Sequence, residues 1–102
     1  MKQMDRDRMI SERIKCRDGF TMSVQASAFH YCSPRETGLG FYEAYEVGYP
    51  SEVEPLLMPY AEDADRPTQT VYGYVPAQVI VSVIAKHEGI AGAANNVRKE
   101  DQ

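Results

Sequence analysis

The chain has 102 residues, 43% of them hydrophobic and 25% charged, with a net charge of −4. This length suits one compact domain, which we place at residues 1–91, and it is too short for two domains. Two classes of protein are excluded: no run approaches the roughly 18 apolar residues of a membrane span, and the basic residues are too few for direct nucleic-acid binding.

The first predicted element is a β-hairpin whose turn is Arg17-Asp18-Gly19. A three-residue loop with Gly19 in the left-handed conformation pairs Cys16 with Phe20 and Ile14 with Met22. A two-residue Asp-Gly loop would instead mix charged and core positions on one face. The hydrophobic pattern therefore selects the three-residue loop. It predicts an inward-facing set of residues: Ile14, Cys16, Phe20, Met22, Val24 and Ala26.

A second region of strand is expected at residues 41–50, ended by Pro50, which cannot donate to a β-ladder. Ser51 and Glu54 have the spacing of a capping box, which predicts a short helix directly after that strand. A further strand is expected at residues 70–75. Alternation in this strand assigns its residues to two faces: Val71, Gly73 and Val75 on one, and Tyr72 and Tyr74 on the other.

Residues 76–88 are predicted to form a C-terminal helix, although their β-branched residues also suit a strand. Pro76 fits a first helical position and Gly89 fits a helix stop. Because His87 lies near the helix end, we expect it to interact with the last carbonyl groups and the helix dipole. Residues with the spacing of one helical face support the assignment: Ile80, Val83, Ile84 and His87.

These elements define an α+β domain, in which an antiparallel sheet of three or four strands is covered by the C-terminal helix, with one further short helix. Residues 1–9 are expected to fray or to form a short polar helix, and residues 92–102 to form a mobile tail. So small a core leaves a marginal stability, and self-association is one way to bury more surface. A homo-oligomer is therefore among the expected states.

Charge is distributed unevenly along the chain. Residues 36–65 contain eight acidic residues and no Lys or Arg, so the remaining residues carry a net charge of +4. This segment is either a solvated acidic face or a surface for a basic protein partner, which would make association sensitive to salt. Four of its residues are the candidate partner-binding set: Glu43, Glu46, Glu52 and Glu54.

The stretch FHYCSPRET, residues 29–37, contains one of two histidines and one of two cysteines. His30 and Cys32, with Cys16 and His87, would offer two sulfurs and two nitrogens to zinc, but their spacing matches no familiar zinc pattern. A Cys32 nucleophile would need an orienting group and an oxyanion hole as well. We therefore predict no metal, no cofactor and no catalytic residue, and Cys16 is expected in the core.

Ser23, Gln25 and Ser27 form a face of small polar residues on the preceding strand, opposite the apolar face. The same stretch continues this face towards Arg35, which can bind a carboxylate or phosphate. This face is either a solvated outer sheet surface or a site for a small polar or anionic ligand. The candidate ligand-binding residues are Ser23, Gln25, Ser27, His30, Ser33, Arg35, Tyr72 and Tyr74.

Three strings together resemble a family of small proteins encoded by bacteriophages and prophages, over roughly residues 14–91: CRDGFTMSVQASAFHYCSPRE, EVGYPSEVEPLLMPYAED and VYGYVPAQVIVSVIAKHEGI. The resemblance implies an accessory protein in the cytoplasm of an infected bacterium, where both cysteines would be thiols. It implies no known activity. The leading hypothesis is a binding protein that inhibits a host defence protein. The alternative is a protein that sequesters a nucleotide-like ligand, or a thiol/histidine enzyme.

Overall fold

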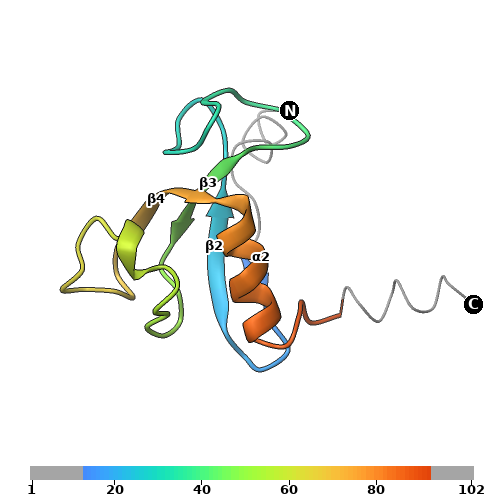
Figure 1. Cartoon of the computed structure of the whole chain (residues 1–102), viewed down its shortest axis with the longest axis vertical. Helices are drawn as coiled ribbons and strands as arrows, with labels where there is room; N and C mark the ends of the chain where they lie inside the picture. The colour runs from blue at the N-terminus through green and yellow to red at the C-terminus, as the bar shows by residue number, and fades with distance from the viewer. Residues whose placement is uncertain (1–12, 93–102) are drawn as a thin grey trace, which may run out of the picture.

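The structure is a computed structural model that describes residues 13–92 (Figure 1). The prediction for residues 1–9 and, apart from Gly92, the prediction of a tail at residues 92–102 lie outside the described residues. The α+β class is confirmed: a four-stranded antiparallel sheet in the order β1-β2-β3-β4 carries an α-helix and a 3-10 turn. The elements are β1 (Ile14–Lys15), β2 (Thr21–Gln25), β3 (Ala44–Gly48), η1 (Met58–Tyr60), β4 (Val71–Pro76) and α2 (Ala77–Lys86).

The hairpin β1–β2 has the predicted three-residue turn. Ile14 pairs with Met22, and the backbone N–H of Cys16 donates to the carbonyl of Phe20 at 2.8 Å. Gly19 has a φ of 101°, a conformation that is strained for residues with a Cβ atom. Asp18 Oδ1 closes the turn by accepting from the N–H of Phe20 at 3.0 Å. The register therefore follows from the turn chemistry and the apolar pattern together.

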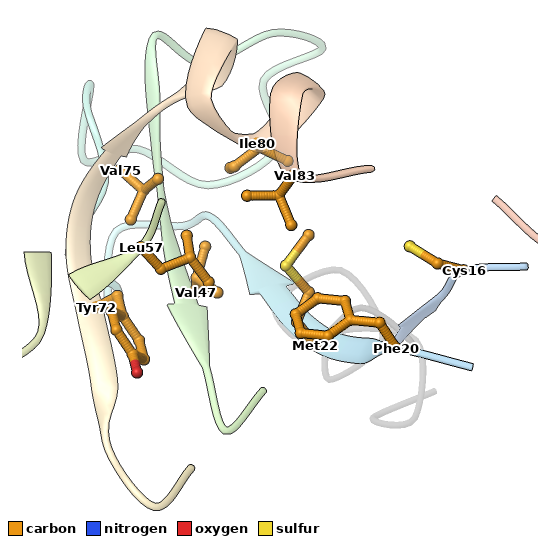
Figure 2. Close-up of a cluster of buried hydrophobic side chains, with 9 residues drawn as sticks. All are labelled: Cys16, Phe20, Met22, Val47, Leu57, Tyr72, Val75, Ile80 and Val83. Atoms are coloured by element: carbon orange, nitrogen blue, oxygen red, sulfur yellow. The ribbon is translucent and has the colours of Figure 1, made fainter. Parts of the chain in front are cut away.

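Helix α2 forms within the predicted range 76–88 but is shorter, because it spans Ala77–Lys86. Pro76, predicted at the first helical position, is the last residue of β4 and the N-cap of the helix. Ile80 and Val83 are buried and point from α2 towards the sheet (Figure 2). The helix ends when the N–H of Gly89 donates back to the carbonyl of Ile84 at 2.8 Å, the pattern of a Schellman stop. The core that the helix closes consists of Cys16, Phe20, Met22, Val47, Leu57, Tyr72, Val75, Ile80 and Val83.

The predicted alternation of β4 is wrong, because the strand contains a bulge. Val47 pairs with Tyr72 and Tyr45 pairs with Val75, so two steps along β3 correspond to three along β4. Tyr74 has a φ of 53° at this point. The extra residue resets the alternation. Tyr72 and Val75 are therefore both buried in the core, while Tyr74 is exposed.

The capping box predicted from Ser51 and Glu54 does not form. Ser51 Oγ instead accepts from the N–H of Thr21 at 2.9 Å, and Glu54 is 1% exposed with its carboxylate turned to the end of α2. The short helix is a single 3-10 turn at η1, after the proline-containing turn around Pro55.

Both outer edges of the sheet are covered by the chain itself. On the β1 side, Cys16 makes an isolated bridge to Ile90. On the β4 side, Ala61 bridges Tyr72, and the N–H of Glu62 donates to the carbonyl of Val71 at 3.0 Å. Of the helices in residues 13–92, none has the length and hydrophobicity that crossing a membrane requires.

Candidate functional site

The segment between β2 and β3 buries part of the polar face on which the ligand prediction depended. Ser27 is 0% exposed and Gln25 is 9% exposed, whereas Ser23 is half-buried. The expectation that all three side chains face solvent is therefore wrong for Gln25 and Ser27. The physical cause is that the segment after β2 folds back against the sheet, where Tyr31 lies over Gly73.

His30 and Cys32 serve this fold rather than a reaction. Ser27 Oγ and His30 Nδ1 share a hydrogen bond of 2.6 Å, and Ser27 Oγ also accepts from the N–H of Phe29 at 3.0 Å. The Cys32 thiol is 1% exposed and donates to the carbonyl of Ser27 at 3.2 Å. The buried Ser27 hydroxyl and the buried Cys32 thiol both form hydrogen bonds to nearby residues of the same segment. Neither group is accessible to a substrate.

The zinc arrangement considered for Cys16, His30, Cys32 and His87 is not assembled. His30 is bonded to Ser27, and His87 uses both ring nitrogens on carboxylates. Within residues 13–92, no three or more His, Cys, Asp or Glu side chains are grouped so that they could hold a metal ion. Both cysteines are buried thiols.

Two aromatic residues of the segment are exposed beside a third from β4. Phe29 is 73% exposed and Tyr31 is 40% exposed in the segment, and Tyr74 of β4 is 47% exposed. The rings of Tyr31 and Tyr74 lie 6.0 Å apart between centroids, at an interplanar angle of 32°. The guanidinium carbon of Arg35 lies 5.6 Å from the centroid of the Tyr31 ring, within the range of a cation–π interaction. We call Tyr31, Arg35 and Tyr74 the aromatic surface, and exposed Phe29 lies two residues before Tyr31 in the chain.

Several hydrogen bonds hold this surface in place. Glu46 Oε1 accepts from the N–H of Tyr31 at 2.9 Å, and the backbone of Ser33 pairs with Ala44 at the start of β3. The hydroxyl of Tyr42 donates to the carbonyl of Glu36 at 2.6 Å. Because these contacts join the segment to the sheet, the aromatic side chains are presented from an ordered backbone.

Sequence reasoning selected Arg35 and Tyr74 but missed Tyr31 and Phe29. The signal that would have found them is the occurrence of two aromatic residues within a polar loop stretch, FHYCSPRE, where no core can bury them. Tyr72, which was also selected, is fully buried. Its hydroxyl donates to the carbonyl of Pro67, and burial raises the pKa of this phenol.

The acidic candidates divide into two groups. Glu43 and Glu52 are exposed and Glu46 is half-buried against Tyr31. Glu54 is buried and is therefore not part of an exposed acidic face. Its two oxygens bind Lys86 Nζ at 2.8 Å and His87 Nε2 at 2.6 Å, which compensates for the cost of burying the charge.

His87 is the centre of a second cluster that sequence reasoning did not predict. Its Nδ1 lies 2.7 Å from Asp18 Oδ2 and its Nε2 lies 2.6 Å from Glu54 Oε1. Instead of meeting only the helix carbonyls, the ring joins the β1–β2 turn to the segment before η1. We call Asp18, Glu54, Lys86 and His87 the charge cluster.

Each charged form in the cluster is favoured by its partners. Burial alone would lower the pKa of His87, but the hydrogen bonds and charges of Glu54 and Asp18 outweigh it and raise that pKa. Burial would raise the pKa of Glu54, but Lys86, the N–H of Leu56 and His87 together lower it. The N–H of Phe20 and then His87 lower the pKa of Asp18, against a smaller opposing effect of desolvation. The surroundings thus favour the charged form of His87, Glu54 and Asp18 over the neutral form.

No pocket is present in the part of the chain that the structure describes. Comparison with models of known protein families, with curated proteins and with solved structures gave no significant match. The aromatic surface is therefore the feature of the described residues that best fits a binding role.

Proposed function

We propose that this protein acts by binding another protein through its aromatic surface. The observation that carries the proposal is the exposed pair of Tyr31 and Tyr74 with Arg35 over the Tyr31 ring. The residues that the structure describes form no pocket. Tyrosine and arginine are the residues most enriched at the energetic centres of protein interfaces. An enzyme or a small-ligand binder would instead use a concave site.

The backbone at Tyr74 supports this proposal. A bulky residue at a φ of 53° costs about 1–3 kcal/mol, and such strain tends to be kept where it serves function. Here the strained bulge turns Tyr74 out to solvent beside Tyr31. An aromatic pair that is already ordered loses little conformational freedom on binding, which favours affinity.

The partner in this proposal is a protein of a bacterial host cell. This step follows the resemblance to phage-encoded accessory proteins and leads to a counter-defence inhibitor as the specific role. Contact would be made by side chains rather than by strand addition, since the sheet edges in residues 13–92 are covered. Exposed Glu43 lies close in sequence to the aromatic segment and would favour a partner with basic residues at the rim.

Site-specific photo-crosslinking in the native host cell tests the proposal. A benzophenone amino acid replaces Phe29, and because this residue is 73% exposed the substitution leaves the core unaffected. In a matched control the same amino acid replaces Val81, which is 55% exposed on α2. We expect one protein to crosslink from position 29 only, with a yield that falls at least tenfold when Tyr74→Ala is added. Equal crosslinking from both positions, or a yield indifferent to Tyr74, would disprove the role of this surface.

A further inference from the structure

The chain beyond α2 returns along the outer edge of β1. The N–H of Arg17 donates to the carbonyl of Gly89 at 2.9 Å, and the N–H of Ala91 donates to the carbonyl of Lys15 at 2.8 Å. Together with the bridge between Cys16 and Ile90, these bonds make residues 89–91 a cover for the β1 edge. Figure 1 shows the end of α2 beside the turn that joins β1 to β2.

His87 lies between the helix and this covering segment. As the residue after the last helical turn, it begins the change in chain direction, and its own carbonyl accepts from the N–H of Asp18 at 3.4 Å. Its ring is buried, 5% exposed, between Asp18 on the hairpin and Glu54 on the segment before η1. The position of this one ring therefore fixes where the covering segment starts.

The geometry also defines the charge on that ring. Both ring nitrogens lie within 2.7 Å of a carboxylate oxygen, and ionised carboxylates only accept hydrogen bonds. Both contacts are satisfied when both nitrogens carry protons, so the geometry fits an imidazolium ring. With Lys86 on the other oxygen of Glu54, two positive charges balance two carboxylates. The ring faces Asp18 from the hairpin, Glu54 from the segment before η1 and the uncharged ring of Phe20, the residue before β2. Lys86 from α2 reaches the cluster through Glu54.

We propose that the protonated His87 ring is a latch that holds residues 89–91 on the edge of β1, and that loss of one ring proton releases them. A neutral ring has one nitrogen that cannot donate. That nitrogen would face a carboxylate oxygen at hydrogen-bond distance, lone pair against lone pair, and the cluster would keep an uncompensated negative charge. Turning the ring away from Asp18 relieves this, and that movement separates the covering segment from the hairpin.

Solution NMR of the full chain tests the latch without any substitution. The ring proton shifts of His87 and His30 are followed from pH 5 to pH 10, and amide hydrogen exchange is measured at each pH. As His87 loses its proton, we expect the amides of Arg17 and Ala91 to lose at least tenfold in protection, after correction for intrinsic exchange. The N–H of Tyr49 donates to the carbonyl of Thr70 next to the β3–β4 pair, away from β1. This amide should keep its protection.

Three outcomes would overturn the proposal. One is that His87 titrates at or below pH 6.5, the ordinary pKa of a histidine. Another is that protection of Arg17 and Ala91 is the same on both sides of the His87 titration. The third is that Tyr49 loses protection in parallel, which would mean that His87 supports the whole fold rather than one segment. His30→Gln, which leaves the charge cluster intact, should retain the pH-dependent change.

Discussion

The imidazole of His87 lies stacked on the ring of Phe20, with the centroids 4.1 Å apart and an interplanar angle of 14°. Phe20 is itself 2% exposed and belongs to the core. A charged ring on an aromatic face gains a cation–π attraction that is stronger when both are shielded from water. The charge cluster is therefore tied to the apolar core as well as to Asp18 and Glu54.

The first prediction concerns this stack. Phe20→Leu should lower the free energy of unfolding by about 1–3 kcal/mol, because the change in shape and the lost cation–π attraction add up. It should also lower the pKa of His87. Urea denaturation and the NMR titration measure these two effects. Met22→Leu is the matched control, since Met22 is fully buried in the same core two residues after Phe20. It should cost less than about 1.5 kcal/mol and leave the pKa of His87 unchanged.

The second prediction is a pH dependence of stability with a defined sign. The pKa of His87 is raised above its ordinary value of 6.5 by Glu54 and Asp18 against the opposing effect of burial. Its contribution is therefore complete below about pH 6.5 and is lost as pH rises through the folded-state pKa. Chemical denaturation of the wild type should show this loss, and His87→Gln should remove it. An unchanged alkaline slope in His87→Gln would contradict the assignment.

The acid side has the opposite sign. The pKa values of Asp18 and Glu54 are lowered in the folded state, so their contribution is present above their ordinary values of 3.8 and 4.5 and is lost as pH falls through the folded values. Stability should therefore be greatest between about pH 4.5 and pH 6.5. The same denaturation series, extended to pH 2.5, measures this maximum.

The third prediction separates the buried carboxylate from its exposed neighbour. Glu54→Gln should cost about 1–3 kcal/mol, because an amide cannot accept from both Lys86 and His87 as the carboxylate does. Glu52→Gln removes the same charge from an exposed position two residues earlier and should change stability by no more than about 0.5 kcal/mol. Equal effects in thermal or urea denaturation would show that Glu54 is not a buried partner of the cluster.

The fourth prediction tests whether strain at Tyr74 serves binding. Tyr74→Gly should raise the free energy of unfolding by up to about 1 kcal/mol, because glycine accepts a positive φ without strain, while it abolishes the photo-crosslink from position 29. Tyr49 offers the control, since it is also exposed and has a φ of 48°. Tyr49→Gly should stabilise similarly and leave the crosslink intact. A crosslink lost equally in both variants would argue against a specific role for Tyr74.

The fifth prediction concerns the close approach of Tyr31 to β4. A Cβ atom at Gly73 would lie 3.3 Å from Tyr31 Cβ, which is tighter than ordinary packing. Gly73→Ala should therefore displace Tyr31 and reduce crosslinking from position 29, although no exposed side chain is removed. At Gly40 an added Cβ would have no neighbour within 4 Å. Gly40→Ala should leave both the Tyr31 ring signals and the crosslink unchanged.

The hairpin and α2 could be predicted because their signals are local. Gly19 at the turn and the apolar residues around it admit one register, and the spacing of Ile80 and Val83 is that of a helical face. The bulge in β4 could not be predicted in this way. The sequence of residues 71–75 shows the same alternation with or without a bulge in the strand. Tyrosine does not favour a positive φ, so its presence at position 74 gives no sign of the bulge.

The charge cluster escaped prediction for a different reason. Glu54 meets Lys86 and His87 from 32 and 33 residues away, and Asp18 meets His87 from 69 residues away. Nothing in the neighbourhood of Glu54 indicates burial, and its position three residues after Ser51 favoured a local capping role instead. Which of two partners an acidic residue binds is decided by the tertiary fold, since a single sequence holds no record of such pairings.

The covered sheet edges have a consequence for assembly. Within residues 13–92, Ala61 and Ile90 occupy positions on the two sides where a further strand would otherwise add, so these covers hinder copies of the domain from extending one another's hydrogen-bond ladder while both stay in place. Any dimer built on the intact domain joins through side chains and has two separate sheets. Growth into fibrils would first require one of the covers to detach, and we expect concentrated solutions to stay clear until that happens.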